Sequence, residues 1–384
     1  MLVSKKKIGL LTGSSLKFFG GGERFIIEFA NELILMGYNV TILTQKSWDI
    51  ENKTIAEIET GSAAKIIWYR IIKPKVGIPF PLFNAKTLNE LKKMDCIYCV
   101  DESLFLNVAM NFISKVRKID FVYGMHTPSS FLFGNELAAT SAKKILWEFY
   151  KIPLRYFFKH FVKKIHVINS SQKKGLMKIN YRGKIFMVPN FLFENKAIII
   201  KKEDKFIVLF SALMNKQIKG IDLLEHIIAL TLDREKEIKF VLTGSLGDSY
   251  DVISALTNKY PENVVYRGFV SDLDLSELRS LSSLNISTSR IEAFPLSILE
   301  AQNAGLPCIS FKIAGPIDMI TNSEQGMLIA PFDINVFSDA ILKYFYEWKE
   351  SKESYNNNRK RIKDIVEARY SKEIIIPKLL EMFD

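Results

Sequence analysis

Cysteine is scarce in this sequence: Cys96, Cys99 and Cys308 are the three cysteines among 384 residues. So few cysteines exclude a disulfide framework and favour a reducing compartment. Cys96 and Cys99 spell C-x-x-C, but no second pair follows. The pair also lies in a predicted strand, where residues three apart face opposite sides. We therefore expect neither a zinc site nor a redox site.

Long hydrophobic runs are also missing, because no uncharged apolar stretch approaches the ~18–20 residues that span a bilayer. The amino-terminal run MLVSKKKIGLLTG passes straight into a glycine-rich turn without a small-residue cleavage site, so no signal peptide is expected. We predict a cytoplasmic protein that associates with a membrane peripherally at most.

Acidic residues are nearly absent from one segment. The chain carries a formal net charge of +11, from 53 basic and 42 acidic residues. Residues 143–184 contain twelve Lys or Arg and a single acid, Glu148, which accounts for the whole excess. A local positive field attracts anionic partners such as lipid headgroups, phosphates or nucleic acid.

Short apolar runs alternate with helix-length amphipathic segments along most of the chain. The first run predicts a strand over Lys7–Thr12, followed by a helix over Glu23–Met36 and a strand over Tyr38–Thr44. Further strands are expected at residues 65–72, 96–100, 121–125, 165–169 and 185–189. This alternation predicts parallel strands with crossover helices, and hence a doubly wound α/β sheet.

The pattern starts again after a charged segment at residues 194–205, which we interpret as a linker. Strands are expected at residues 206–211, 239–243, 264–269, 284–287, 308–311 and 327–329, with a helix over 221–232. The simplest architecture is two Rossmann-like domains, 1–193 and 205–368, that face each other across a cleft. In open α/β sheets, ligands bind beyond the carboxyl ends of the strands.

The stretch from Ser289 to Pro307 is the most informative. Pro295 is predicted at the first helical position, with the helix continuing over 296–304. The free N–H groups of a helix start suit diphosphate oxygens. Glu292 precedes this helix and Glu300 lies within it. Such carboxylates can accept hydrogen bonds from sugar hydroxyls, each worth about 1.5–3 kcal/mol. On spacing alone, a loop acid and an exposed helix residue are the more frequent interpretation.

In its context this stretch resembles the E-x7-E signature of retaining glycosyltransferases with the GT-B fold, in particular the large family-4-like group. Other segments resemble motifs of the same family in the same order along nearly the whole chain: Gly20–Glu23, Met125–Ser129, Val188–Asn190, Lys219–Leu224, and the glycines at 244, 268 and 326. The resemblance implies a hexosyltransferase whose amino-terminal domain binds the acceptor and whose carboxyl-terminal domain binds a nucleotide-sugar donor. Residues 369–384 resemble the terminal helix that crosses back to the amino-terminal domain in this fold.

The resemblance also implies roles for residues of the donor domain. Lys219 would neutralise the diphosphate, and the N–H groups of Phe294 and Leu296 would cradle it. Glu300 would hold the ribose hydroxyls, and Glu292 would contact the donor sugar. Lys219 and the helix N–H groups would stabilise the negative charge that grows on the leaving oxygen, so no metal or other cofactor is implied.

Three further residues receive roles by the same resemblance. The backbone at Val270 would read the base of a UDP- or GDP-sugar. Gly21 would let its loop approach the phosphates without a side chain in the way. His126 would hydrogen-bond the transferring sugar. The implied acceptor is lipid-linked or a polysaccharide.

Two positions depart from the family pattern: Phe191 stands where the family has a glycine after Asn190, and the second departure bears on the donor site. The family has an arginine in the turn before the Lys219 element, where this chain has Ala212. The connection from Met214 to Ile218 is also longer than usual, and Lys216 within it is a candidate substitute. A lysine lacks the bidentate fork of arginine, which bears on donor affinity.

Other candidates have simpler interpretations. Asp272 and Asp274 spell D-x-D, but they precede a helical run, where acids favour the helix dipole. His160, His166 and His226 are expected to be structural. A non-catalytic sugar-nucleotide binder and a sugar-nucleotide epimerase remain alternatives, and nucleic-acid binding lacks a recognised module.

The segment at residues 153–164 allows two interpretations. Leu154, Phe157, Phe158 and Phe161 share one helical face, and Arg155, Lys159 and Lys163 line another. This layout suits an interfacial helix on an anionic bilayer. The same layout suits a helix that packs its aromatic face on the sheet, which is the more frequent cause.

Overall fold

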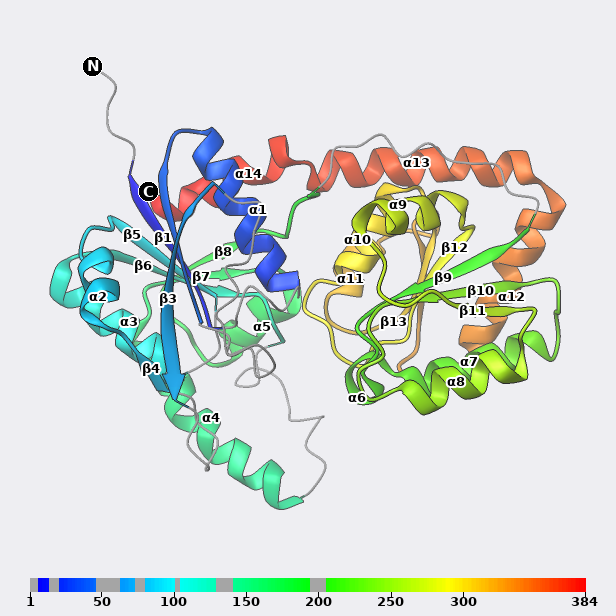
Figure 1. The fold of residues 1–384 in the computed structure, drawn as a ribbon, viewed down its shortest axis with the longest axis horizontal. Coiled ribbons are helices and arrows are strands. Elements are labelled where there is room, and N and C mark those ends of the chain that lie inside the picture. The colour runs from blue at the N-terminus through cyan, green and yellow to red at the C-terminus, as the bar shows by residue number, and fades with distance from the viewer. Residues whose placement is uncertain are drawn as a thin grey trace, which may run out of the picture. The chain divides into compact units, whose positions relative to one another are not determined.

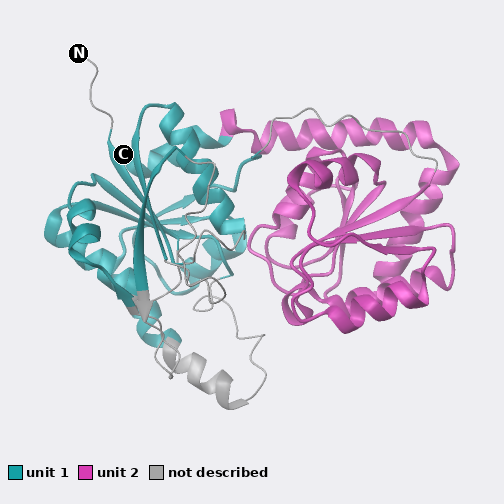
Figure 2. Ribbon diagram, in the orientation of Figure 1, with its two compact units in different colours: residues 1–193, 375–384 teal, residues 194–374 magenta. Residues whose placement is uncertain are grey.

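The computed structural model describes residues 6–13, 21–45, 63–72, 80–100, 104–128, 141–193 and 205–384, with the backbone alone at 71–72, 80, 104–105 and 141–150. The chain divides into two compact units (Figure 2). Unit 1 contains residues 1–193 and 375–384, and unit 2 contains residues 194–374. Residues 194–204 of the linker predicted over 194–205, the motif glycine Gly20 and the motif residue Ser129 lie outside the described residues.

Unit 1 is a doubly wound sheet (Figure 1). Its strands are β1 (Lys7–Thr12), β2 (Asn39–Gln45), β3 (Lys65–Ile72), β4 (Phe80–Leu82), β5 (Cys96–Val100), β6 (Asp120–Met125), β7 (Lys164–Val167) and β8 (Lys184–Met187). They lie in the order β4-β3-β2-β1-β5-β6-β7-β8. All pairs are parallel except β3 with β4. The strand order reverses between β1 and β5, the topological switch point of this sheet.

The helices of unit 1 cover the sheet through apolar faces. They are α1 (Gly21–Leu35), α2 (Ala85–Leu91), α3 (Leu104–Arg117), α4 (Ser141–Phe161) and α5 (Ser170–Lys178). Leu154 and Phe158 of α4 are fully buried and join the same core as Ile97 and Cys99 of β5. Core packing therefore explains most of the aromatic face predicted for residues 153–164.

Unit 2 repeats the design. Its strands are β9 (Ile207–Ser211), β10 (Lys239–Thr243), β11 (Val264–Tyr266), β12 (Leu284–Ser287), β13 (Cys308–Phe311) and β14 (Gly326–Ile329). They are all parallel, in the order β11-β10-β9-β12-β13-β14. This is the order of a dinucleotide-binding Rossmann sheet, with its switch point between β9 and β12.

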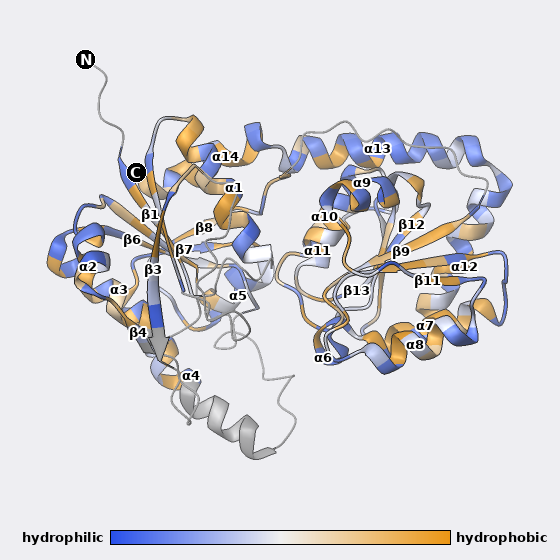
Figure 3. Ribbon diagram, in the orientation of Figure 1, coloured by the Kyte–Doolittle hydropathy of each residue, from blue (hydrophilic) through white to orange (hydrophobic). Residues whose placement is uncertain are grey.

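Helices flank both faces of the second sheet; Figure 1 shows α7 and α8 on one side and α9 and α10 on the other. Its helices are α6 (Lys216–Lys219), α7 (Ile221–Leu232), α8 (Tyr250–Lys259), α9 (Asp272–Leu281), α10 (Leu296–Asn303), α11 (Pro316–Met319), α12 (Ile334–Glu350) and α13 (Lys352–Tyr370). The core is a continuous apolar cluster that includes Phe240, Ile227 and Phe345. Figure 3 shows α13, by contrast, as largely hydrophilic.

A predicted strand end, the predicted place of Pro295 and one missed strand are the informative differences from the structure. β11 ends at Tyr266 rather than Phe269, because Gly268 adopts a left-handed φ of 69° and its carbonyl accepts from the Gly244 amide at 2.9 Å. Pro295 is the N-cap of α10 and not its first residue, since its ψ of 104° is extended. The short antiparallel strand β4 was not predicted.

The chain ends in two helices where we predicted one terminal helix over 369–384. α13 ends at Tyr370, Ser371 is extended, and α14 (Lys372–Leu380) follows, then a short 3-10 turn over Glu381–Phe383. Residues 375–384 belong to unit 1. There, Phe383 stacks on Phe29 with ring centroids 6.0 Å apart.

Candidate active site

The candidate donor site of unit 2 lies where its strand order reverses. β9 ends at Ser211 and β12 at Ser287, and the loops that follow hold the Lys219 element and the Glu292 element. Adjacent parallel strands deliver the loops at their carboxyl ends to the same edge. The topology therefore brings together two motifs that are about 70 residues apart in sequence.

A glycine sets the distance between the two loops. Gly220 has a left-handed φ of 63°, and a Cβ built on it would lie 2.2 Å from the carbonyl oxygen of Thr288. No other residue fits this contact without moving the backbone. On the other side, the Thr288 hydroxyl donates to the Lys219 carbonyl at 2.8 Å. The Lys219 element is therefore pressed against the strand-β12 loop.

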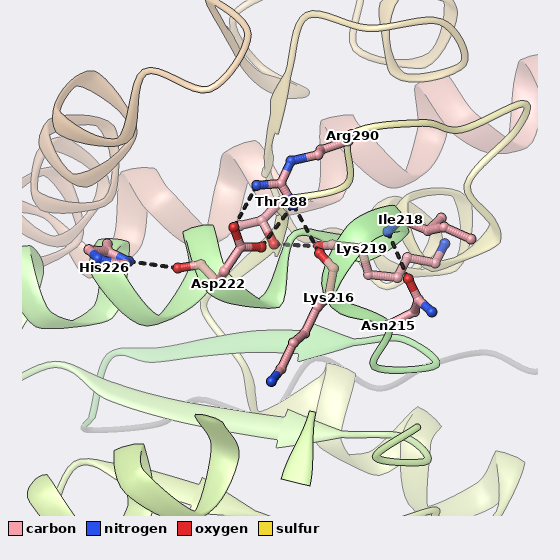
Figure 4. Close-up of polar contacts among 8 residues, drawn as sticks. All are labelled: Asn215, Lys216, Ile218, Lys219, Asp222, His226, Thr288 and Arg290. Atoms are coloured by element: carbon pink, nitrogen blue, oxygen red, sulfur yellow. Dashed lines mark hydrogen bonds and ion pairs between the residues drawn. The ribbon is translucent and has the colours of Figure 1, made fainter. Parts of the chain in front are cut away.

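An arginine clamp reinforces this contact (Figure 4). The Arg290 guanidinium donates to both carboxylate oxygens of Asp222, at 2.8 and 2.6 Å, and to the Lys216 carbonyl at 2.9 Å. The Arg290 amide donates to the Ile218 carbonyl at 2.8 Å. Hydrogen bonds from Arg290 hold the pKa of the Asp222 carboxyl below its usual value. The clamp thereby ties α6 and α7 to the loop that carries Glu292.

Lys219 and Glu292 form an ion pair where these two loops meet. The Lys219 Nζ lies 2.5 Å from Glu292 Oε1, and the Ser289 hydroxyl donates to the same oxygen at 2.8 Å. The side chains are 25% and 11% exposed, so both charges are reachable yet largely shielded from water. A cation and a carboxylate that share one small site can contact a phosphate and a sugar hydroxyl at once.

The start of α10 lies in the same loop. Leu296 is its first residue and Phe294 is buried against Tyr370, with ring centroids 5.8 Å apart. The first N–H groups of a helix have no intrahelical partner. Further along, Glu300 pairs with Arg279 of α9. The two acids of the E-x7-E stretch are therefore each held by a cation.

The remaining predicted donor-domain residues lie apart from this pair. Lys216 points away from Lys219 in Figure 4, and its Nζ lies 2.7 Å from the Asp251 carboxylate on α8. Its side chain is thus engaged outside the Lys219–Glu292 pair. Ala212 follows β9, where its carbonyl backs onto Gly244. Val270 is half-buried in the loop between β11 and α9.

Two predicted residues belong to unit 1. Gly21 is the first residue of α1 and is exposed. His126 follows β6, with its ring 4.3 Å from that of Phe25 on α1. A Cβ built on Gly22 would lie 3.9 Å from that of His126, so the start of α1 and the histidine share one edge of the sheet.

His166 is more than the isolated structural residue we predicted. The Tyr98 hydroxyl lies 2.7 Å from His126 Nε2 and 2.6 Å from His166 Nδ1. Burial lowers the pKa of His126 well below its usual value and lowers that of His166 to about 4. Sequence analysis missed these hydrogen bonds between Tyr98 and the two histidines. A tyrosine inside a buried strand does, however, indicate a hydroxyl that needs a partner.

Sequence analysis also missed the supporting cations and hydroxyls of unit 2. Arg279, Arg290 and Ser289 hold Glu300, Asp222 and Glu292, respectively. Arg290 and Ser289 lie within the motif stretch, so the sequence could have predicted that they lie close to Glu292. The pairing of Arg279 with Glu300 could not be predicted in this way, because the two residues lie on different helices.

Asp272 and Asp274 lie in the first turn of α9, whose N-cap is Ser271. This agrees with a helix-start interpretation of the D-x-D pair. Within the described parts of the chain, no group of three or more His, Cys, Asp or Glu is arranged to hold a metal ion. Nor does any helix there have the length and apolarity needed to cross a membrane.

Two family models match consecutive parts of the chain. The model described as Glycosyltransferase Family 4 matches residues 19–192, and the one described as Glycosyl transferases group 1 matches residues 193–361. The chain belongs to the family-4-like glycosyltransferases. The expected GT-B fold, with two Rossmann-like domains, is confirmed by a solved structure of TarM from Staphylococcus aureus. That structure has a TM-score of 0.74 and 15% identity, and the match covers 99% of this chain and 100% of that one.

Two relatives are similar in sequence to this glycosyltransferase. One is described as an uncharacterized 41.2 kDa protein in the cps region of Klebsiella pneumoniae; it is 25% identical over 321 residues, which are 71% of this chain and 87% of that protein. The other is named alpha-galactosylglucosyldiacylglycerol synthase, from Streptococcus pneumoniae. It is 25% identical over 260 residues, 60% of this chain and 67% of that protein.

Proposed function

We propose that this glycosyltransferase moves a hexose from a UDP- or GDP-sugar to a lipid-linked or polysaccharide acceptor, with retention of the anomeric configuration. The observation that carries the proposal is the Lys219–Glu292 ion pair beside the amino terminus of α10, at the switch point between β9 and β12. The TarM structure is described as a complex with UDP, and the pneumococcal relative is named as a glycolipid synthase. Both support the proposal.

In this proposal the Lys219 ammonium and the N–H groups at Phe294 and Leu296 bind the diphosphate. Negative charge grows on the leaving oxygen as the bond to the sugar breaks, and fixed donors stabilise that charge without reorganising. Glu292 accepts a hydrogen bond from the donor sugar, and Glu300 accepts hydrogen bonds from the ribose. The backbone at Val270 contacts the base, Gly21 admits the phosphates, and His126 contacts the sugar.

The proposed chemistry uses fixed cationic and amide groups in place of a metal. The acceptor hydroxyl attacks the face of the sugar that the nucleoside diphosphate leaves, so the new bond keeps the old configuration. The proton of the acceptor hydroxyl passes to the departing diphosphate oxygen. Glycosyl transfer should therefore continue in excess EDTA, and the anomeric proton coupling of the product should match that of the donor.

A matched pair of lysine variants tests the donor site. We expect Lys219→Met to lower the rate of transfer by about 10²–10³, because one charge-stabilising donor is lost. Lys216→Met should stay near the unsubstituted rate, since Lys216 pairs with Asp251. The measurement is release of nucleoside diphosphate from labelled UDP-, GDP- and ADP-sugars. Release from none of them, or equal loss in both variants, would contradict the proposal.

An exposed apolar surface on unit 1 supports a membrane-bound acceptor. Val108, Phe112 and Val116 of α3 are exposed, as are Ile152, Tyr156 and Phe161 of α4; we call these six residues the α3–α4 surface. The Lys115 ammonium lies 4.8 Å from the centre of the Phe161 ring, which joins the two helices. Arg155 and Lys159 lie on α4, and Lys163 follows its end. Apolar side chains with nearby lysines suit an anionic bilayer.

The α3–α4 surface differs from the membrane-binding face predicted for residues 153–164, because Leu154 and Phe158 of that face are buried in the core. We expect the protein to sediment with vesicles that contain anionic lipid at low salt, and to be released as salt rises. Phe112→Asp should reduce sedimentation, whereas Phe269→Asp, at an exposed position of unit 2, should leave it unchanged. Sedimentation that is equal for both variants would exclude the α3–α4 surface.

A further inference from the structure

Two buried side chains in unit 1, Tyr98 and His166, form a hydrogen-bonded series with the partly buried His126 and determine where the protons lie on His126. His166 Nε2 is 2.7 Å from the carbonyl oxygen of Val188. A carbonyl can only accept, so this nitrogen carries a proton. With the pKa of His166 lowered to about 4 by burial, the ring is neutral at pH 7, and its Nδ1 is an acceptor.

The next link follows from counting protons. The Tyr98 hydroxyl lies 2.6 Å from His166 Nδ1, so it donates its only proton there. Its second contact, 2.7 Å from His126 Nε2, must then be one in which the tyrosine oxygen accepts. His126 therefore carries its proton on Nε2. Burial keeps this ring neutral too, so its Nδ1 bears a lone pair.

The three hydrogen-bonded side chains are sterically confined. Tyr98 is fully buried on β5, and a Cβ built on Gly124 of β6 would lie 2.4 Å from its hydroxyl oxygen. Glycine at position 124 thus leaves room for the hydroxyl between the two histidines. Phe25 packs against the His126 ring. The imidazole is consequently held in one orientation by contacts on several sides.

His126 Nδ1 is the last atom of this hydrogen-bonded series. It is buried, and it has no hydrogen-bond partner among the residues that the structure describes. A buried acceptor without a donor is costly, so a ligand that brings a hydroxyl to this atom is favoured. A phosphate or a carbonyl oxygen is disfavoured there, because it has no proton to donate.

We propose that Tyr98 and His166 are positioning residues that hold His126 as the Nε2–H tautomer, so that its Nδ1 accepts a hydrogen bond from a hydroxyl of the transferring sugar. The identity of the hydroxyl-bearing ligand rests on the proposed function, whereas the tautomer does not. The three hydrogen-bonded residues His166, Tyr98 and His126, which we call the histidine relay, thereby select for a donor sugar that keeps a hydroxyl at one position. An analogue with fluorine at that position accepts but cannot donate, and binds poorly.

The tautomer is tested directly by long-range ¹H–¹⁵N NMR on protein labelled with ¹⁵N-histidine. His160 is exposed and serves as the internal reference for a ring in water, and a His126→Ala variant assigns the His126 signals. We expect His126 Nδ1 to resonate as an unprotonated nitrogen and Nε2 as a protonated one. In Tyr98→Phe the two signals should move toward the averaged values of the His160 reference. Protonated Nδ1 in the unsubstituted protein overturns the proposal.

The role in sugar recognition is tested with the same labels. Addition of the active nucleotide-sugar should shift the His126 Nδ1 signal, and addition of the nucleoside diphosphate alone should not. Tyr98→Phe, verified as folded by circular dichroism, should lower kcat/KM for the donor about tenfold, because the hydrogen bond from the bound sugar is weakened. If donor leaves Nδ1 unmoved while nucleoside diphosphate is still released, the hydroxyl assignment fails and the proposed function stands.

Discussion

The charged residues of the donor site occur in pairs. Lys219 is bound to Glu292, Glu300 to Arg279, and Arg290 to Asp222. Each pair orients its members, because a charge-assisted hydrogen bond is roughly twice as strong as a neutral one. Of these cations, Lys219 is the one that the proposed mechanism uses directly. Arg279 and Arg290 hold acids on neighbouring elements in place.

The buried histidines make the stability of unit 1 depend on pH. Burial lowers the pKa of His166 to about 4, while the unfolded chain titrates near the ordinary value of about 6.5. Between these values the unfolded state binds more protons, so stability falls as pH falls and the loss is complete below about pH 4. From pH 7 to pH 5, His166 alone should lower the free energy of unfolding by about 2 kcal/mol.

Urea unfolding at several pH values checks this prediction. His166→Gln should show a shallower dependence on pH than the unsubstituted protein, whereas His226→Gln, at an exposed position, should show the same dependence. His126 titrates in the same direction and leaves a residual slope in both variants. A profile that stays unchanged in His166→Gln would show that this ring is not the origin.

At the scale of elements, the candidate site depends on how closely two loops approach. Gly220 and Gly268 both have left-handed φ values, of 63° and 69°. A Cβ on Gly220 would lie 2.2 Å from the Thr288 carbonyl oxygen, whereas a Cβ on Gly268 meets nothing within 4 Å. The two glycines therefore separate the effect of backbone conformation from that of loop contact.

We predict that Gly268→Ala costs about 1 kcal/mol of stability, the strain of a left-handed alanine. Gly220→Ala should cost about 3 kcal/mol or more, since the alanine methyl also displaces the Thr288 strand end. It should also reduce donor turnover, because Lys219 and Glu292 come from the two displaced loops. Thermal unfolding and nucleoside diphosphate release measure both effects. Equal losses of stability would mean that the loop contact is not tight.

The bounds of helices and strands could be predicted where the local sequence pattern was clear. The bounds of β10, β12, β13 and α7 were predicted from apolar runs and a following turn. β4 was missed because three residues with a central proline, Pro81, show no alternation, and its pairing with β3 is not local. Pro295 was predicted one position too far into the helix, because proline tolerates both the N-cap and the first turn and its ψ is set by packing.

At the scale of the whole molecule, the last ten residues complete the core of unit 1. Ile375, Ile376 and Leu379 are buried there. Phe383 is 3% exposed, and its ring also lies 6.5 Å from that of Tyr98. Lys164 Nζ donates to the Met382 carbonyl at 3.1 Å. The end of the chain thus supports the same strand that carries the histidine relay.

Phe383→Ala should therefore destabilise unit 1 by about 3–5 kcal/mol, the usual cost of removing a buried phenylalanine. Hydrogen exchange of the β1 and β5 amides should accelerate, while the β9 and β10 amides of unit 2 keep their protection. Phe269→Ala, at a 76% exposed position, is the control and should change neither. Faster exchange in both units would indicate that they unfold together.

The sequence by itself determined the fold class, the two repeats of the β-α pattern and the order of the family motifs, because each depends on apolar spacing and glycine positions within a short window. Tertiary structure decided how side chains meet: Tyr98 with two histidines, Arg279 with Glu300, and Lys216 with Asp251. It also buried Phe158 and left Phe112 exposed. These outcomes depend on which strands and helices become neighbours, and periodicity along one segment carries no information about its neighbours.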